Sequence, residues 1–176
     1  MRNYIAKSTV LPVKSAVVVD GNKTEARVAG RLQISVDCVD PVPLAVFWAA
    51  ALGYQVEDPP DGFASWNEYY RSLGVADEEL DDDQDAADSI VDPAGRGPRI
   101  RFEPVPERKS VKNRLHFDLK VADRAAPVAE RMVIIDAEAD RLVALGARVL
   151  RRVPPDTIDH YFVVMADPED NEFCVA

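Results

Sequence analysis

Two segments of the chain alternate apolar and polar side chains in the same way. RLQISVDCVD covers residues 31–40, and RLHFDLKVAD covers residues 114–123. Successive side chains on a β-strand point to opposite faces of the sheet, so each segment is predicted to be a strand with one apolar and one polar face. The predicted apolar faces are Leu32, Ile34, Val36 and Cys38 in the first strand, and Leu115, Phe117, Leu119 and Val121 in the second.

Each predicted strand is followed by a helical pattern and then by further strands. Apolar residues from Leu44 to Leu52 recur at helical spacing, and Gly53 closes the pattern. DAEADRLVALGARVL, residues 136–150, has the same character in the second half. Asp-Pro turns precede the final strands, RIRFEPV and NEFCVA. The predicted class is therefore α+β, with two paired βαβββ modules whose curved mixed sheets enclose a trough.

The repeat divides the chain into four parts. Residues 1–29 are expected to be a loosely ordered N-terminal extension, and residues 30–104 the first module. A charged linker, residues 105–113, leads to the second module, residues 114–176. The first module also carries an insertion, roughly residues 57–89, that its copy lacks. Neither unit can cover both faces of its own sheet, so the two copies are expected to pair.

The insertion combines an aromatic segment with an acidic run. In GFASWNEYYRSLG, the side chains of Phe63, Trp66, Tyr69 and Tyr70 fall along one side of a predicted helix. They either pack on the core or form a lid over a cavity. DEELDDDQDAAD, residues 77–88, is typical of a solvated loop, and it lacks the glycine and glutamate spacing of an EF-hand calcium loop.

Composition narrows the function classes. The 176 residues are 47% hydrophobic and 30% charged, which is ordinary for a globular protein that folds without a disulfide or a metal. A net charge of −10 argues against general binding to nucleic acid or to anionic membranes. No apolar run approaches the length of a transmembrane helix. The two cysteines, Cys38 and Cys174, are predicted on opposite faces and unpaired, and a cytoplasmic protein is the simplest interpretation.

The predicted polar faces carry the side chains that are candidates for binding a metal ion or a small molecule. If the two halves close edge to edge, their polar faces enclose a common trough. Gln33 and His116 occupy matching positions of the repeat, one in each first strand. Glu103, from the last strand of the first half, and either Glu172 or Cys174, from the last strand of the second, are predicted to point into the same space.

These modules resemble the vicinal oxygen chelate superfamily, and within it the glyoxalase-like domains related to glyoxalase I, bleomycin-resistance proteins and extradiol dioxygenases. The resemblance rests on RLQISVDCVDPVPLAVFWAAALGY, NRLHFDLKVAD and DPEDNEFCVA, and it covers residues 31–176. In metal-dependent members, the first and last strands of each half supply one ligand apiece. The resemblance thus implies Gln33, Glu103 and His116 as metal ligands, with Cys174 at the fourth position and Glu172 as its stand-in.

One interpretation is therefore a metal-dependent lyase, isomerase or ring-cleaving dioxygenase acting on a small molecule with vicinal oxygens. Its cofactor would be one divalent ion, Zn²⁺, Ni²⁺, Co²⁺ or Fe²⁺, acting as a Lewis acid. Glu103 or Glu172 would carry the proton. Cys174 departs from the usual glutamate, and the inward cations Arg101 and Lys120 would repel a metal ion.

The other interpretation is a metal-free protein that sequesters a drug-like small molecule. Aromatic walls with a few placed polar groups are typical of such pockets. The predicted ligand-binding side chains are Trp48, Trp66, Tyr69, Arg101, Phe162 and Cys174. Both interpretations take a small molecule as the partner, with neither nucleic acid nor membrane, and dimerisation, which is common in the resembled family, fits either of them.

Overall fold

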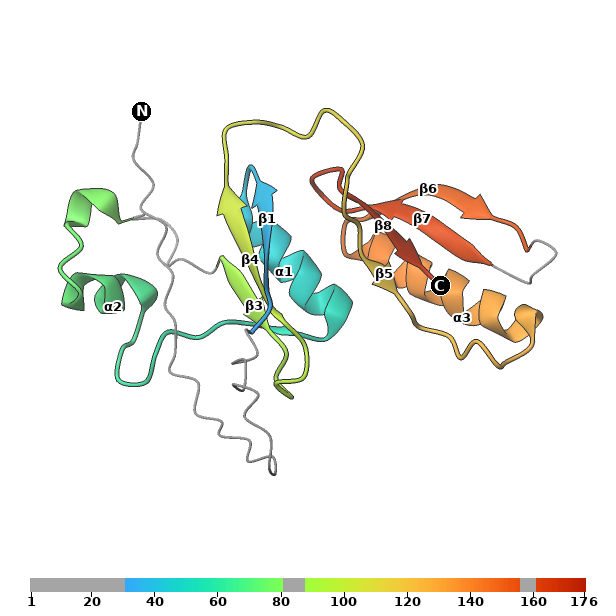
Figure 1. Cartoon of the computed structure of the whole chain (residues 1–176), viewed down its shortest axis with the longest axis horizontal. Coiled ribbons are helices and arrows are strands. Elements are labelled where there is room, and N and C mark those ends of the chain that lie inside the picture. The colour runs from blue at the N-terminus through green and yellow to red at the C-terminus, as the bar shows by residue number, and fades with distance from the viewer. Residues whose placement is uncertain (1–30, 81–87, 156–160) are drawn as a thin grey trace, which may run out of the picture. The chain divides into compact units, whose positions relative to one another are not determined.

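The computed structural model of the protein describes residues 31–80, 88–155 and 161–176. Leu32–Ala176 form one compact unit, built from two four-stranded mixed sheets (Figure 1). The predicted N-terminal extension, residues 1–29, lies outside the described residues. Among the described residues, no helix combines the length and the apolar character needed to cross a membrane. A cytoplasmic location and a homodimer stay predictions.

The first sheet has the strand order β1-β4-β3-β2, with β1 and β4 parallel and the other pairs antiparallel. Helix α1 packs on one of its faces. Helix α2 and a short 3₁₀ helix, η1, lie between β2 and β3 in the chain. The elements are β1 (Gln33–Cys38), α1 (Pro41–Leu52), β2 (Gln55–Val56), α2 (Trp66–Ser72), η1 (Asp77–Glu79), β3 (Ser89–Val91) and β4 (Arg99–Pro104).

The second sheet repeats this arrangement with the order β5-β8-β7-β6. Strands β5 and β8 are parallel, and the other neighbouring pairs are antiparallel. Helix α3 packs on it as α1 packs on the first sheet. The elements are β5 (Asp118–Leu119), α3 (Val128–Ala144), β6 (Arg148–Val153), β7 (Phe162–Ala166) and β8 (Glu172–Val175). The prediction of an α+β fold made of two βαβββ modules is confirmed.

The alternation along the strands sets which face each side chain occupies. In the parallel ladder of β1 and β4, Ile34 lies beside Ile100 and Val36 beside Phe102, on the face that packs into the core. The neighbouring β1 positions that alternate with them, Gln33, Ser35 and Asp37, are exposed. Each sheet therefore has one apolar and one polar face, as predicted.

The strand predicted to contain His116 is shorter than expected and begins after that residue. β5 comprises only Asp118 and Leu119, and Leu115, expected to face the core, is 86% exposed. Just before β5 the side chain of Asn113, rather than a main-chain carbonyl, accepts the N–H of Glu172. The ladder of β5 and β8 begins at Asp118, after a last main-chain bond from Cys174 to the carbonyl of Phe117. Leu32 likewise precedes β1 and is exposed, so both predictions were wrong at the start of a strand, where no partner strand fixes the face.

Helix α1 depends on the second module at both of its ends. Its N-cap residue, Asp40, makes no side-chain capping bond. Instead, the carboxylate of Glu169, from the turn between β7 and β8, accepts the N–H groups of Val39 and Asp40 at 2.6–2.9 Å. At the other end, the guanidinium of Arg141 in α3 donates to the carbonyls of Ala50 and Ala51 at 3.2 and 3.3 Å. Each charge is the one that the helix dipole favours at that end.

The Glu169→Ala variant is therefore expected to lose about 1–2 kcal/mol of its free energy of unfolding, the usual cost of removing an N-terminal cap. Glu169→Gln keeps an acceptor oxygen and loses only the charge, so it should lose less than 1 kcal/mol, roughly the value of the helix-dipole effect. Urea unfolding followed by circular dichroism measures both losses. Equal losses in the two variants would contradict capping as the role of Glu169.

The shared core lies between the modules and contains Trp48 of α1. This side chain is 2% exposed, and its ring meets those of Phe117 and Phe173, both from the second module, edge to face with centroids 5.1 Å apart. Its indole N–H donates to the buried carboxylate of Asp167 at 3.1 Å. Trp48, predicted as a pocket wall, is thus a core residue with a satisfied polar group.

The aromatic part of the insertion forms helix α2, as predicted. Ser65 accepts the N–H of Glu68, and the Glu68 carboxylate accepts the N–H of Ala64, a reciprocal capping box. Trp66 is buried and donates its indole N–H to the carbonyl of Glu57. Its ring also contacts those of Tyr69 and Tyr70. Of the acidic run, residues 81–87 lie outside the described part of the chain.

Candidate functional site

The polar face of the first sheet separates two of the predicted metal ligands. In the ladder of β1 and β4, Gln33 lies beside Arg99, whereas Glu103 lies beside Asp37, four positions further along. At about 3.3 Å per residue, this offset is roughly 13 Å along the strands. The structure therefore does not bring Gln33 and Glu103 to one point, and the residue opposite Gln33 is a cation.

Two arginines hold the polar groups of this face. Arg99 forms an ion pair of 2.6 Å with Glu57 and donates to the side-chain oxygen of Gln33 at 3.0 Å. Arg101 lies between two carboxylates, 3.3 Å from that of Asp88 and 3.1 Å from that of Glu103. Its side chain is only 18% exposed. Glu57 and Asp88 come from the two ends of the insertion, so the insertion supplies the acids that fix both arginines.

Tyr70 of α2 lies against this network. Burial raises the pKa of its hydroxyl, Asp88 adds to the rise, and Arg101 opposes it. The insertion thus lies near the polar face of the first sheet through both its ends and Tyr70. The predicted ligand-binding residues Trp66 and Tyr69 contact each other, with ring centroids 6.0 Å apart. Phe162 lies half-buried in β7.

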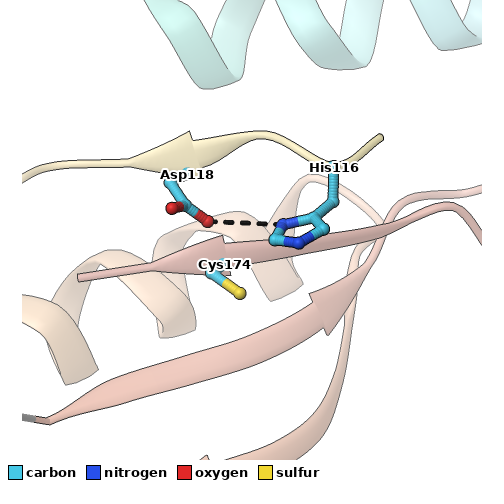
Figure 2. Close-up of side chains that lie close together, drawn as sticks. All are labelled: His116, Asp118 and Cys174. Carbon is cyan, nitrogen blue, oxygen red and sulfur yellow. Dashed lines mark ion pairs between the residues drawn. The ribbon is translucent and has the colours of Figure 1, made fainter. Parts of the chain in front are cut away.

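The second sheet brings three donors of different kinds together (Figure 2). Asp118 of β5 lies beside Cys174 of β8 in the parallel ladder, and His116 lies two residues before Asp118. His116 Nδ1 is 3.4 Å from Asp118 Oδ1, and one donor atom from each of the three side chains lies within 4.8 Å of the others. In the described part of the chain, this is the one group of three or more His, Cys, Asp or Glu side chains so placed.

Both acidic and basic side chains surround His116, Asp118 and Cys174. Burial raises the pKa of Cys174, and the neighbouring Asp118 carboxylate, which accepts from the thiol, raises it further. Lys120 Nζ is 3.4 Å from the other oxygen of Asp118. Glu172 pairs with Lys112, which lowers the pKa of the Glu172 carboxyl. At neutral pH, Cys174 is therefore a protonated thiol and Glu172 a paired carboxylate, so neither is poised as a nucleophile or a base.

The other cysteine is inert by its position. Cys38 is 2% exposed, and burial, reinforced by Glu169, raises the pKa of its thiol to about 12. Both cysteines are free thiols, in agreement with their predicted placement on opposite faces.

A cavity of about 420 Å³, open to solvent, lies where the two modules meet. Its wall combines Ile34, Leu52 and Ile100 of the first module with Phe117 and Val121 of the second. Asp118 and Lys120 are its charged lining residues. None of the side chains predicted to bind a ligand lines it. Of its strand residues, Ile34 and Ile100 are predicted to face the core, and Lys120 is predicted to lie on the polar face.

Tyr54 also lines this cavity, and its ring occupies space that is free only because residue 97 is a glycine. A Cβ at Gly97 would lie 1.8 Å from the Tyr54 hydroxyl oxygen, far inside van der Waals contact. The loop that contains Gly97 is held by Asp92, whose carboxylate accepts the N–H groups of Ala94, Arg96 and Gly97. No sequence pattern predicts this packing, because the two residues are distant along the chain.

Comparison with known proteins gives the family. Residues 33–176 match the sequence profile of the glyoxalase-like domain family. The chain belongs to this family. The predicted resemblance is thereby confirmed over both modules. No curated protein sequence matches the chain significantly.

Solved structures share the fold of this glyoxalase-like protein at low sequence identity. The fosfomycin resistance protein FosX from Listeria monocytogenes is 10% identical with a TM-score of 0.51, over 85% of this chain and 93% of that one. A mutant of that protein, complexed with Mn(II) and a dihydroxypropylphosphonic acid, is 13% identical with a TM-score of 0.50, over 84% and 91%. Lactoylglutathione lyase from Agrobacterium tumefaciens is 14% identical with a TM-score of 0.45, over 84% and 92%.

The residues of this chain fit a family-type metal centre poorly. Gln33 and Glu103 are separated along the strands, and the arginines that pair with them would repel a divalent ion. His116 lies in the other module, with Asp118 and Cys174. A centre shared by both modules would require both arginine pairs to break.

Proposed function

We propose that this glyoxalase-like protein binds an apolar small molecule in the cavity between its modules, without a metal ion shared by the two modules. The observation that carries this proposal is the pairing of Arg99 and Arg101 with the polar groups of the first sheet. Of the side chains that would have to bind the metal, Glu103 already neutralises the half-buried Arg101, and the side-chain oxygen of Gln33 already accepts from Arg99.

The cavity has the size and chemistry of a small-molecule site. Ligand pockets in proteins usually hold about 300–1,000 Å³ and are lined mainly by apolar side chains with a few polar groups. The volume of about 420 Å³ falls in that range. Asp118 and Lys120 supply opposite charges, which would orient a ligand with one polar end and one apolar body.

A metal-dependent lyase or isomerase is the weaker candidate. Its proton carrier would be Glu103 or Glu172, and a catalytic base works best when its pKa lies near the working pH. Glu103 is held by Arg101, and Lys112 lowers the pKa of Glu172 away from neutrality. The FosX mutant with Mn(II) and a phosphonic acid is related in fold, which supports a small-molecule ligand here but not its identity.

Binding of a fluorescent apolar anion, anilinonaphthalene sulfonate, tests the proposal. The full-length protein is expected to bind one probe per chain with a Kd on the order of 10 µM, equivalent to roughly −7 kcal/mol. Excess EDTA should leave this Kd unchanged. A loss of probe binding in EDTA would overturn the metal-free proposal and favour the metal-dependent alternative.

A pair of neighbouring alanines on α1 gives the matched control. Ala51 lines the cavity, whereas Ala50 is exposed on the same helix and does not line it. Ala51→Phe is expected to fill part of the cavity and weaken probe binding by about tenfold, equivalent to roughly 1.4 kcal/mol, and Ala50→Phe to leave it unchanged. Circular dichroism checks that both variants fold. Equal probe affinity in the two variants would place the ligand elsewhere.

A further inference from the structure

We propose that the exposed segment between the two modules, residues 106–115, is a docking surface for an acidic peptide segment of a partner protein. These residues are called the linker patch below. The proposal goes beyond the proposed function, because no residue of the linker patch lines the cavity. None of them is a predicted metal ligand either, so each proposal can fail without the other.

The linker patch is a positive region of an acidic protein. Its sequence, PERKSVKNRL, contains one acid, Glu107, and four cations, Arg108, Lys109, Lys112 and Arg114. Its charge is therefore +3, and since the whole chain carries −10, the other residues carry −13. Salt screens charges that are more than about 8 Å apart at physiological ionic strength. A ligand that touches only the linker patch therefore interacts mainly with its positive charge.

Most of these cations have no acidic partner. Within the ranges that the structure describes, Lys112 is the one cation of the linker patch that forms an ion pair, with Glu172. Asn113 accepts the main-chain N–H of Glu172, so the segment is anchored to the second sheet at this point. Arg108, Lys109 and Arg114 are exposed. Carboxylates of a partner can pair with these three side chains without breaking an existing ion pair.

Two apolar side chains lie between the cations along the linker patch. Val111 is 74% exposed and Leu115 is 86% exposed, the two largest values for a large apolar side chain in the described part of the chain. Covering such surface removes it from water and stabilises a complex. The linker patch therefore offers apolar contacts as well as charge, which favours a partner with apolar residues between its acids.

The main chain of the linker patch favours a peptide over a lipid surface. Residues 106–115 belong to no helix or strand, and none of them forms a hydrogen bond with another main-chain group of the described residues. An extended peptide can pair with such free N–H and C=O groups, as peptides do when they add a strand to a protein. In the hydrocarbon region of a membrane, the same groups would lose their bonds to water. A planar anionic surface would also meet more of the acidic remainder of the chain.

Fluorescence anisotropy with the full-length protein tests the proposal. The probe is a fluorescein-labelled synthetic peptide in which pairs of glutamates alternate with single leucines, and the control peptide has glutamine in place of every glutamate. The acidic peptide is expected to bind with a Kd on the order of 100 µM at low salt, because each exposed ion pair contributes little. Binding should weaken about tenfold when the salt concentration is raised to about 0.5 M. The glutamine peptide should bind at least about tenfold more weakly than the acidic one.

Two double variants with the same change in net charge locate the binding surface. Arg108→Glu combined with Lys109→Glu is expected to weaken binding of the acidic peptide about tenfold. Arg96→Glu combined with Arg151→Glu, at two exposed arginines outside the linker patch, should change the Kd by less than about twofold. Leu115→Ser should weaken binding severalfold, because its apolar contact is lost. Circular dichroism checks that each variant folds.

Three results would overturn the proposal. The first is no binding of the acidic peptide, or equal binding in the two double variants. The second is a molecular mass, measured by light scattering, that rises with protein concentration in the wild type but not in the Arg108→Glu/Lys109→Glu variant, which would make a second copy of the chain the occupant. The third is stronger binding to phosphatidylserine vesicles than to the peptide, again lost in that variant, which would make the occupant a lipid surface.

Discussion

The Trp48→Ala variant is expected to lose about 3–5 kcal/mol of its free energy of unfolding, the usual cost of truncating a large core aromatic. The indole is 2% exposed and fills the space between α1 and the aromatic rings of Phe117 and Phe173. Its removal would leave a cavity between the two modules. Most small domains are stable by only 5–15 kcal/mol, so the variant would be close to unfolding.

Urea unfolding followed by far-ultraviolet circular dichroism measures this loss, since fluorescence would change with the substitution itself. Trp48→Phe keeps most of the apolar contact and removes the indole N–H, so its loss should be about half as large. Trp66→Ala, in the insertion, is the matched tryptophan control and should lose less than Trp48→Ala. A loss below 1 kcal/mol in Trp48→Ala would contradict the central place of this side chain in the core.

The second large effect is expected at Asp167. Its carboxylate is 1% exposed and accepts the indole N–H of Trp48, the main-chain N–H of Glu169, and both the main-chain and side-chain N–H groups of Asn171. Asp167→Ala leaves buried donors without a partner. At about 1 kcal/mol for each of the four donors, we expect a loss of about 4 kcal/mol in the free energy of unfolding, measured in urea.

The loss at Asp167 should also depend on pH. Burial raises the pKa of this carboxyl above its ordinary value of 3.8, and the N–H donors of Asn171 and Trp48 oppose the rise. The folded protein then holds the proton more tightly than the unfolded chain. Its contribution to stability is full below pH 3.8 and declines as the pH rises through the raised pKa.

Asp167→Asn cannot titrate, so it isolates this effect. The difference in stability between wild type and Asp167→Asn should be larger near pH 4 than at pH 7, because other carboxyl groups titrate alike in both proteins. Unfolding in urea at several pH values across that window gives the difference. A difference that grows towards pH 7 would contradict a raised pKa for Asp167.

The fold was predictable where the sequence repeats itself. Alternation along residues 33–38 and the helical spacing that ends at Gly53 both describe elements that form as expected, with Gly53 in the left-handed conformation that ends α1. The start of the second repeat was not predictable. Leu115 keeps the apolar pattern, but it is exposed, and near it the N–H of Glu172 donates to the side chain of Asn113 instead of a main-chain carbonyl. The alternation of apolar and polar residues predicts which side chains a strand would bury, but it does not predict where the pairing with the neighbouring strand ends.

The candidate site was predictable only as a list of side chains on a shared face. Parity placed Glu103 and Arg101 on the polar side of the first sheet correctly, but it could not show that they pair with each other. The acids that complete the network, Glu57 and Asp88, come from the two ends of the insertion. Trp48 is predicted as a pocket wall because it is aromatic, and the sequence cannot show that its indole N–H donates to Asp167, 119 residues away.

The dependence of α1 on Glu169 and Arg141 also affects how the chain folds during its synthesis. A ribosome adds about 5–20 residues per second. The carboxylate that caps the start of α1 lies 129 residues beyond Asp40, so it emerges roughly 6–26 s later. During that interval the apolar face of the helix has no second module to cover it. A stalled or truncated chain that ends before the second module would expose the same apolar surface of α1.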